Sequence, residues 1–296
     1  MAESRLLSAI GDLPSAMTGT DLAPVALGLV SALSWGAGDF SGGWAAKRTP
    51  VYGVVIISQA VGGVLLIVLA ALLGEPIPPS IDFIWGAVAG VGGGIGLVAL
   101  YTALAAGRMG VAAPVSAVVA AGIPVVFGIF SDGWPALLQF LGFAVALVAV
   151  WFISRSEDVK MRLPDLWLPL VAGTGFGMFF VAIGRTSGVA VLWPLVGTRV
   201  ASSTLLIVIA CLMRQPMAAK REHLGFIALS GVLDTGGNAF YALAARAGRM
   251  DVAAVLGSLY PASTVWLAWL ILKERLTRLQ MIGIVAALAA IVLIAI

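Results

Sequence analysis

The sequence of 296 residues contains one cysteine and one histidine, and these two scarcities exclude several kinds of chemistry. A single cysteine, Cys211, cannot form an intramolecular disulfide or a thiolate-held metal cluster, so an inert packing role is expected for it. His223 lies beside Lys220 and Arg221 in a short polar stretch, and no histidine, cysteine and carboxylate residues occur with metal-ligand spacing. The sequence therefore predicts no metal site and no cofactor.

Charged residues are also scarce, at 10% of the chain, whereas 61% of the residues are hydrophobic and the mean hydropathy is +1.08. A soluble protein of this length has too little interior to bury so much apolar surface, so the lipid bilayer is the expected solvent. The formal net charge of +3 comes from Lys and Arg between the apolar segments, where they face headgroups, and no nucleic-acid partner is expected.

Ten apolar segments each approach the length of about 20 residues that a helix needs to cross a bilayer. They lie at about 23–43, 51–73, 83–106, 111–131, 135–154, 165–186, 189–213, 224–247, 252–272 and 277–296. Backbone groups in lipid must pair within their own segment, so the predicted fold is an all-α membrane protein with ten transmembrane helices. Residues 1–22 form a tail whose apolar stretch is too short for a secretory signal core.

The second half of the chain repeats the first at a fixed offset of 141 residues, since the run GRMGVAA at Gly107–Ala113 returns as GRMDVAA at Gly248–Ala254. Further matches at this offset are Gly36 with Gly177, Gly90 with Gly231, Gly96 with Gly237 and Gln139 with Gln280. We expect two five-helix repeats, at 23–154 and 165–296, within one membrane domain. Because five is odd, the second repeat crosses the bilayer in the opposite sense, and such inverted repeats are typical of secondary transporters with a site near the midplane.

The loops also carry an orientation signal. The connections after odd-numbered spans hold 12 Lys and Arg residues, against 4 in the tail and the connections after even-numbered spans. The positive-inside rule then places both termini outside a cell's inner (plasma) membrane, in a multi-pass protein.

Three motifs carry a resemblance to a known family. Span 1 reads GLVSALSWGAGDFSGGWAAKR with Trp35–Gly36 near its middle, span 7 contains WPLVGTR with Arg199 inside the membrane, and span 10 begins ERLTRLQMIG. Together they resemble the EamA-type branch of the drug/metabolite transporter superfamily, over both halves. Gly133 stands where the second half has Glu274, so no essential role is assigned to that acidic residue. The aromatic-bearing spans are most similar to YddG-type aromatic amino-acid exporters, and export is implied by this resemblance alone.

Glycine and proline mark places where helices approach one another or break. Gly90 lies on a stripe of glycines in span 3, and Gly231 is its partner at the repeat offset. Small residues at this spacing allow close helix packing, which either is static or lets the faces slide during gating. Pro124 and Pro261 lie at comparable depth in spans 4 and 9. Helix breaks at corresponding positions point to a substrate site, and simple kinks are the alternative.

Polar and aromatic side chains deep within the spans supply the candidate site. Asp234, Asn238 and Tyr241 share one stripe of span 8, and Arg199 lies near the centre of span 7. A charge at the centre of a span costs about 2.5–3.5 kcal/mol, so such residues face protein or water. Arg199 has either a functional role or a structural one, bonded to carbonyls or a carboxylate. The candidate substrate-binding residues are Ser34, Trp35, Gln59, Tyr101, Asn238, Tyr241 and Tyr260.

The function that these features predict is secondary transport of a small organic solute by alternating access, by a monomer in the bilayer. The solute class we expect is an aromatic or hydrophobic amino acid, and other metabolites or drugs are the alternative. For proton coupling, Asp234 is favoured over Asp39, because Asp39 lies about two turns from Lys47 and Arg48 and is expected to snorkel toward the surface.

An intramembrane enzyme is a remote alternative. GAGD at Gly36–Asp39 fits the GxGD pattern of diaspartyl intramembrane proteases, with Asp234 as the second aspartate. The order of the two aspartates is reversed here and the downstream Pro-Ala-Leu is missing. We therefore expect no enzymatic activity.

Overall fold

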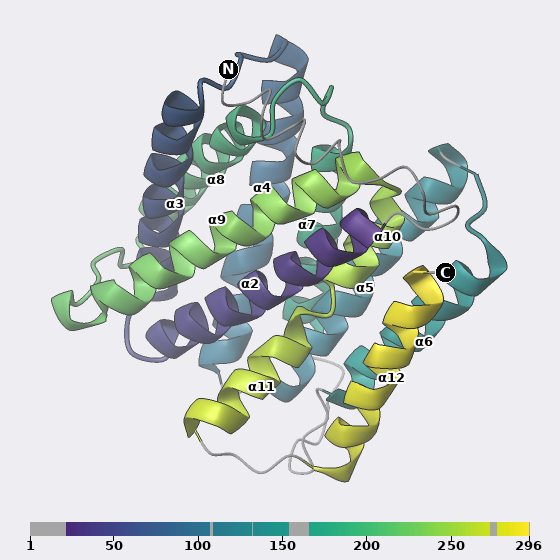
Figure 1. The fold of residues 1–296 in the computed structure, drawn as a ribbon. Helices are drawn as coiled ribbons and strands as arrows, with labels where there is room; N and C mark the ends of the chain where they lie inside the picture. The colour runs from purple at the N-terminus through teal and green to yellow at the C-terminus, as the bar shows by residue number, and fades with distance from the viewer. Residues whose placement is uncertain (1–21, 107–108, 132, 154–165, 273–276, 296) are drawn as a thin grey trace.

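The computed structural model describes residues 22–106, 109–131, 133–153, 166–272 and 277–295, and this part of the chain is helical with no strand (Figure 1). The helices of the first half are α2 (Leu22–Ala46), α3 (Val51–Leu73), α4 (Ser80–Ala105), α5 (Met109–Ser131) and α6 (Leu137–Ile153). Those of the second half are α7 (Trp167–Gly184), α8 (Leu192–Leu212), the 3-10 turn η2 (Arg221–His223), α9 (Leu224–Ala247), α10 (Met250–Gly257), α11 (Tyr260–Leu272) and α12 (Arg278–Ala295). Apart from Leu22, the expected tail at 1–22 lies outside the described residues.

Five of these helices are both long and apolar enough to cross a bilayer, namely α2, α3, α4, α7 and α8. Shorter apolar helices lie at Val115–Ser131, Leu137–Phe152 and Arg278–Ala290. Helix α9 has 24 residues, but Asp234, Asn238 and Arg246 lower its hydropathy. The all-α fold is therefore confirmed, and the count of ten spans stays a prediction.

The outer surface of the bundle is apolar. Leu72 is 78% exposed, Phe130 is 87% exposed and Leu137 is 74% exposed, and each lies on a different helix. A water-facing surface does not carry so many large apolar side chains, whereas lipid accepts them without cost. Cys211 also lies on this exposed surface, on α8, so the packing role expected for it is wrong.

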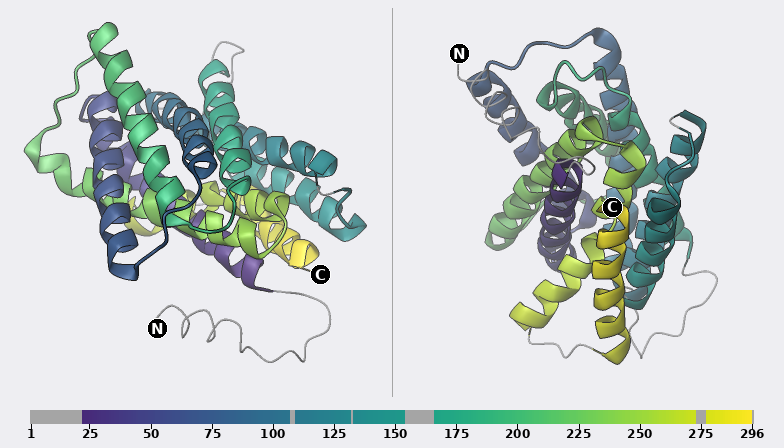
Figure 2. Two further views of the ribbon diagram at one scale, coloured as in Figure 1. Left: turned by 90° about the horizontal axis from the view of Figure 1, so that it is seen from above. Right: turned by 45° about the vertical axis from the view of Figure 1, so that its right-hand side comes forward.

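Helices of the first half pack chiefly against helices of the second half. Helix α2 runs along α9, and α7 runs along α4 in the matching way; α3 meets α9 as α8 meets α4. Helix α5 packs on α7, just as α10 and α11 pack on α2. Figure 1 shows α2 and α9 side by side across the front of the molecule, and Figure 2 shows α12 beside α6. Each contact thus has a partner when the halves are exchanged.

This pattern divides the core of the bundle into two groups that mix the halves. We call α2, α3, α9, α10 and α11 body 1, and α4, α5, α7 and α8 body 2. The bodies meet where α3 contacts α8, where α10 contacts α5 and where α4 contacts α2 and α3. Helices α6 and α12 pair at the side. Each of these groups therefore mixes helices of the two sequence repeats.

Glycines produce the closest approaches within each body. A Cβ added at Gly90 would strike the carbonyl oxygen of Thr198 on α8, and one added at Gly231 would strike that of Ser58 on α3. Gly86 and Gly94 meet α8 one turn to either side of Gly90. The predicted glycine stripe is thus a helix contact, and it lies inside a body rather than between the two bodies.

Among the described residues, a break inside a predicted span occurs in the second half alone. Helix α5 runs unbroken through Pro124, whereas α10 ends at Gly257 and α11 begins at Tyr260. Pro261 occupies the second position of α11. In a continuous helix its N–H would bond to the carbonyl of Gly257, four residues back, but proline has no N–H and its ring clashes with that carbonyl. The expected pair of broken helices is therefore wrong for span 4 and right for span 9.

The connections gather at two ends of the bundle. At the first, which we call end 1, the Glu75 carboxylate accepts hydrogen bonds from the backbone N–H groups of Val191, Leu192 and Trp193 at 2.7–3.0 Å, where it caps α8. Asp82 accepts from the Ser187 N–H at 2.8 Å and from its hydroxyl at 2.5 Å. The α3–α4 and α7–α8 connections are therefore joined at end 1.

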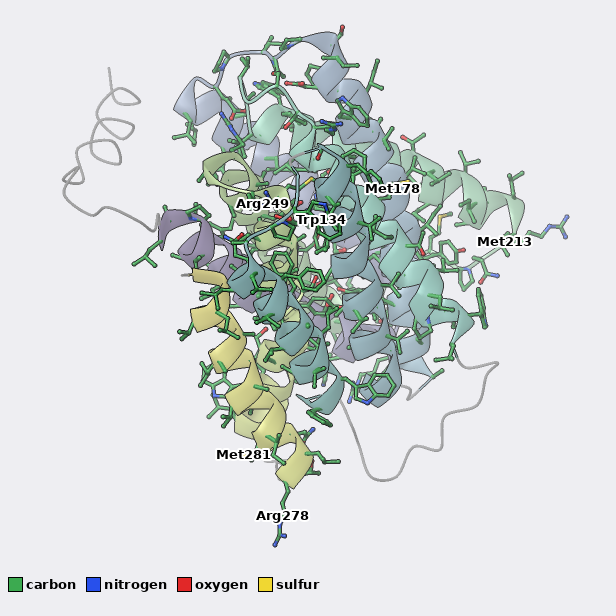
Figure 3. The ribbon with its side chains drawn as sticks, turned by 90° about the vertical axis from the view of Figure 1, so that its right-hand side faces the viewer. Trp134, Met178, Met213, Arg249, Arg278 and Met281 are labelled. Carbon is green, nitrogen blue, oxygen red and sulfur yellow. The ribbon has the colours of Figure 1, made fainter. Side chains whose placement is uncertain are left out.

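Two further bonds strengthen end 1. Arg246 donates to the carbonyl of Gly188, and Arg249 Nη2 donates to that of Gly133 at 3.0 Å. Figure 3 shows Arg249 next to Trp134, with Arg278 pointing away from the opposite end of the molecule. At that end, which we call end 2, the Thr49 hydroxyl and His223 Nδ1 lie 2.8 Å apart and join the α2–α3 connection to η2. Within the described residues, polar contacts thus join connections at both ends.

Candidate functional site

A cavity of about 60 Å³ lies between body 1 and body 2. Both halves of the chain line it. Its aromatic lining residues are Trp35, Phe176, Phe179, Phe180 and Tyr260; its polar ones are Asp39, Gln59, Thr198, Arg199, Ser202, Asp234 and Asn238; and Gly90, Gly93 and Gly94 lie on its α4 wall. This volume admits a few water molecules, since one water needs about 10–15 Å³ on this measure. At this size the cavity is too small for an aromatic amino acid.

Arg199 lies at the centre of the polar side of the cavity. Its Nη1 donates to Asp234 Oδ2 at 2.6 Å and also to Gln59 Oε1, and its Nη2 donates to Thr235 Oγ1 at 3.0 Å. The Arg199 side chain is 5% exposed and that of Asp234 is 19% exposed. Because α8 belongs to body 2 and the three acceptors lie on body 1, Arg199 links the two bodies across the cavity. Arg199 is therefore bonded to a carboxylate, as in the structural role considered for it from the sequence.

The guanidinium is not fully satisfied. Arg199 Nε is buried and has no hydrogen-bond partner within the described part of the chain. A Cβ built on Gly62 would lie 3.3 Å from it, so Gly62 leaves the room in which this N–H sits. A buried donor without a partner costs about 1–3 kcal/mol, which makes this a place for a water molecule or a ligand acceptor.

Asp39 faces the same cavity from α2. The hydroxyl of Tyr101 hydrogen-bonds it, and this hydroxyl also lies 3.1 Å from Ser230 Oγ. The Tyr101 ring is fully buried and fills the space above Gly42, so its hydroxyl is held in place. Arg48 instead lies over the Trp44 ring and donates to the Trp44 carbonyl at 2.9 Å. The structure therefore places Asp39 in the cavity rather than snorkelling toward Lys47 and Arg48.

The apolar side of the cavity is a cluster of rings around Trp35. Its centroid lies 5.4 Å from that of Phe180 and 6.4 Å from that of Phe179, with Phe179 edge-on. The Trp35 Nε1–H donates to Asn238 Oδ1 at 2.8 Å, which fixes the indole and turns the Asn238 amide nitrogen away from it. One end of the cavity thus offers aromatic faces, and the other offers hydrogen-bonding and charged groups.

Tyr260 closes the cavity at the break between α10 and α11. Its hydroxyl lies 2.9 Å from Ser116 Oγ and donates to the Ala113 carbonyl at 3.2 Å, so it links α11 to α5. Its own carbonyl accepts from the hydroxyls of Ser263 and Thr264, which also bond to α2. Pro261 therefore acts on the site through the position of Tyr260 and does not line the cavity itself.

The sequence-predicted site residues divide into two groups. Trp35, Gln59, Asn238 and Tyr260 line the cavity, as do Asp39, Asp234, Arg199 and Gly90. The other predicted residues, Ser34, Tyr101, Tyr241, Gly231, Pro124 and Pro261, do not belong to its lining.

The tyrosine and serine hydroxyls outside the cavity have backbone or side-chain partners. Tyr241 is fully buried, and its hydroxyl donates to the Phe180 carbonyl at 2.8 Å. The Ser34 hydroxyl donates to the Leu233 carbonyl at 2.7 Å and ties α2 to α9. The Tyr101 hydroxyl hydrogen-bonds Asp39. These three side chains therefore shape the site without facing it.

Sequence reasoning missed the α7 wall. Phe176 is the partner of Trp35 at the repeat offset, and it packs on Gly96 as Trp35 packs on Gly237, the partner of Gly96. Mapping the Trp35 position across the repeat would have found Phe176. Phe179 and Phe180 had no such signal, because phenylalanine in an apolar helix is expected on any face.

A larger hollow of about 560 Å³ opens at end 2, between α3, α4, α7 and α8. It is lined mainly by apolar side chains, with Tyr52, Thr102, Trp167 and Gln215 among them. Leu97 of the central cavity directly precedes Val98 of this hollow on α4. The hollow and the central cavity thus involve neighbouring residues of α4.

The described residues include no group of three or more histidine, cysteine, aspartate or glutamate side chains placed to hold a metal ion. Glu274 lies outside the described residues. The remainder of that motif is structural, because Thr277 and Gln280 form a capping box in which Gln280 Oε1 accepts from the Thr277 N–H at 2.8 Å and the Thr277 hydroxyl accepts from the Gln280 N–H at 3.2 Å.

An apolar exterior and an all-helical bundle are those of a multi-pass membrane protein, and its centre holds a cavity lined by aromatic and polar side chains. Residues 22–155 and residues 163–296 each match the EamA-like transporter family. The chain therefore belongs to this family, within the drug/metabolite transporter superfamily, whose members are membrane transporters of small solutes.

Structural comparison agrees with this fold. A crystal structure of a protein that is 16% identical in sequence superposes with a TM-score of 0.71, over 91% of this chain and 95% of the other. At this identity the likeness establishes the fold alone. None of the curated proteins matches the chain.

Proposed function

We propose that this protein is a secondary transporter that exports aromatic or hydrophobic amino acids by alternating access. The observation that carries the proposal is the central cavity, in which an aromatic wall around Trp35 faces a small polar group around Arg199 and Asp234. An aromatic amino acid has the same two ends. Its ring finds stacking partners in Trp35 and Phe179, and its polar groups find Asn238 and Asp39.

The moving units in this proposal are body 1 and body 2 rather than the two repeats. The cavity lies between them and is too small for an amino acid as it stands, so access requires them to move apart. Arg199 joins them near the middle. At end 1 the Glu75 carboxylate, which follows α3, bonds to the start of α8, and Arg246 of α9 bonds to the Gly188 carbonyl before α8. These contacts, with the hollow at end 2, support a state that is closed at end 1.

The exchange of contacts between halves supports ten spans arranged as two inverted five-helix repeats, with the boundaries 23–154 and 165–296. The Lys- and Arg-rich connections belong to end 2, so the positive-inside rule makes end 2 cytoplasmic and puts both termini outside. The inner (plasma) membrane and a monomer complete this proposal. An experimental structure with parallel repeats would contradict it.

Two alternatives are weaker. Other metabolites or drugs remain candidate solutes, but sugar phosphates need several free Lys or Arg groups, and the one arginine of the cavity is already paired. An aspartyl protease needs two carboxylates that share a proton. Asp39 and Asp234 do face one cavity, yet the Arg199 pairing of Asp234 removes that arrangement.

A binding screen tests the solute class. Purified protein in detergent would be heated with each of the twenty amino acids, a nucleotide-sugar, a sugar phosphate and a cationic drug, and the shift in Tm would be recorded. We expect phenylalanine, tryptophan and leucine to raise the Tm, and Trp35→Ala to abolish the shift. Trp134→Ala, at a side chain that is 77% exposed and outside the cavity, serves as the matched control. A shift with sugar phosphate and none with phenylalanine would contradict the proposal.

A further inference from the structure

The charges that line the central cavity do not balance. Its ionisable side chains, within the described residues, are Asp39, Asp234 and Arg199, together with the neutral phenol of Tyr260. Arg199 is committed to Asp234 at 2.6 Å, and its remaining bonds go to Gln59 and Thr235. An ionised Asp39 would therefore have no counter-charge in the cavity lining.

The neighbouring residues of Asp39 on α4, α9 and α11 leave this imbalance in place. From α4 the Tyr101 hydroxyl donates one neutral hydrogen bond, from α9 Asp234 repels it, and from α11 Tyr260 adds no positive charge. The nearest cations along α2, Lys47 and Arg48, are exposed, and Arg48 lies on Trp44. A carboxylate in a medium of low dielectric is costly unless it is paired or protonated, and one neutral donor does not compensate it.

An aromatic ring stands next to this carboxylate. Trp35 lies four residues before Asp39, so both side chains project from the same face of α2 into the cavity. The Phe179 and Phe180 rings complete the wall around Trp35. Aromatic faces attract cations as well as apolar groups, so the place beside Asp39 suits an ammonium group attached to an aromatic or aliphatic body.

We propose that Asp39 binds the ammonium group of the solute, and that a proton occupies Asp39 when no solute is present. This inference rests on the proposed transport function and names the solute chemistry that the cavity recognises, a primary amine with an apolar body. The ammonium is the required feature, and a carboxylate on the solute is accepted but not required, since Arg199 is already neutralised by Asp234. Asp39, rather than the Asp234 favoured by sequence, is then the coupling residue.

The exchange balances in charge. An amine R–NH₃⁺ enters from the open end and the Asp39 carboxyl releases its proton to that same end, so the ion pair that forms is neutral, as the protonated carboxyl was before. After the bodies move, a proton from the other end replaces the amine, which leaves. One proton thus crosses for each ammonium in the opposite direction, and with a simple amine the Asp39 charge is compensated at every step.

Three ligands with one ring separate the contributions of the two solute charges. Phenylalanine has both groups, phenethylamine has only the ammonium, and 3-phenylpropionate has only the carboxylate. Binding of each to the purified protein would be measured by calorimetry in weak buffer, with a pH indicator to count released protons. Asp39→Asn is the test variant. Glu222→Gln makes the same carboxyl-to-amide change at an exposed position on η2, outside the cavity, and is the control.

We expect phenethylamine to bind and to compete with phenylalanine, with about one proton released per amine bound. We expect 3-phenylpropionate not to bind. Asp39→Asn should weaken phenethylamine binding by on the order of 30-fold or more, the usual effect of removing one member of a buried charge pair, and should release no proton. Glu222→Gln should match the wild type, and an unchanged melting curve for Asp39→Asn would show that it is folded.

The outcomes separate this inference from the proposed function. Binding of 3-phenylpropionate without phenethylamine, or proton release that survives Asp39→Asn, overturns the role of Asp39 and leaves amino-acid transport standing. Phenethylamine binding with proton release, in a protein that does not transport phenylalanine, supports the role of Asp39 and moves the function toward amines. If Asp39→Asn does not fold, Asp39→Glu decides the matter, since a retained carboxyl must retain proton release. Binding of none of the three overturns the inference.

Discussion

At the scale of single residues, the behaviour of the site depends on one buried guanidinium. Arg199 connects α8 to α3 and α9, and it neutralises Asp234. The sequence identified the position, because an arginine in the middle of an apolar span must face protein or water. It did not identify the partner, because helical periodicity gives the face of a residue and not the helix that covers that face.

Replacing Arg199 should therefore be strongly destabilising. Arg199→Met leaves the Asp234 carboxylate without a partner, and we expect a loss of about 3–5 kcal/mol in the free energy of unfolding, seen as a lower Tm in detergent. The double variant Arg199→Met with Asp234→Leu should recover most of the loss, because both charges are then gone. Arg221→Met, at an exposed arginine of η2, is the control. Wild-type stability for Arg199→Met alone would contradict the described pairing.

The three buried tyrosines show which properties of a side chain can be predicted from its residue type. Tyr101, Tyr241 and Tyr260 share one expectation, that a buried hydroxyl needs a partner. Each has one, yet only Tyr260 lines the cavity, while the other two bond to Ser230 and to the Phe180 carbonyl. The requirement for a partner follows from chemistry, whereas the choice between cavity and packing depends on which helices meet.

At the scale of the helix, the glycine stripe of α4 determines how closely two elements approach. Gly90 touches the backbone of α8 at Thr198, so its lack of a side chain is needed there. The sequence predicted this contact from spacing but left static packing and sliding open. Its position within body 2 favours static packing, because α4 and α8 then move together.

Two glycine-to-alanine changes, expected to have different effects on the free energy of unfolding, test this contact. Gly90→Ala forces a methyl group against the α8 backbone, and we expect it to cost about 1–3 kcal/mol in the free energy of unfolding. Gly122→Ala lies in α5 with no atom within 4 Å of the added Cβ, so it should be neutral or stabilise by up to about 1 kcal/mol. Chemical denaturation in mixed micelles measures both. Equal effects of the two changes would exclude the close contact at Gly90.

Pro261 correctly predicted a helix break in the ninth span. Pro124 also predicted a break in the fourth span, where the helix is continuous. Both prolines remove a helical hydrogen bond, but a proline alone permits either a kink or a break. The break at Gly257 coincides with the approach of the Trp35 ring, since a Cβ there would lie 2.9 Å from Trp35 Cζ3. At the corresponding position the first half has Ser116, which instead bonds to Tyr260. This difference is tertiary and does not appear in local sequence.

At the scale of the whole molecule, the repeats interleave. The all-α class, the family and the fixed offset followed from composition, motifs and spacing. The pairing of α2 with α9 and of α4 with α7 did not, because a repeat period says nothing about whether the two copies pack beside each other or through each other. The interleaved packing is what creates a cavity lined by both copies.

Interleaving predicts that neither repeat folds alone. Residues 1–162 leave the faces of α2 and α4 without α9 and α7, the helices that bury them. Expressed separately, each half should be degraded or aggregate, whereas the two halves expressed together should form a complex that survives detergent extraction. Protease resistance and co-purification measure this. A monomeric, protease-resistant first half would show that the repeats are independent units.

The central claim, that the cavity between the two bodies carries an aromatic amino acid across the membrane, is tested most directly by counterflow. Proteoliposomes loaded with unlabelled phenylalanine would receive external labelled phenylalanine, with wild type, Trp35→Ala and the exposed control Trp134→Ala compared at equal protein content. The account predicts transient accumulation of label for the wild type and the control, at least tenfold less for Trp35→Ala, and none when sugar phosphate replaces phenylalanine on both sides. Accumulation of sugar phosphate with no phenylalanine exchange, or full activity of Trp35→Ala, would contradict it.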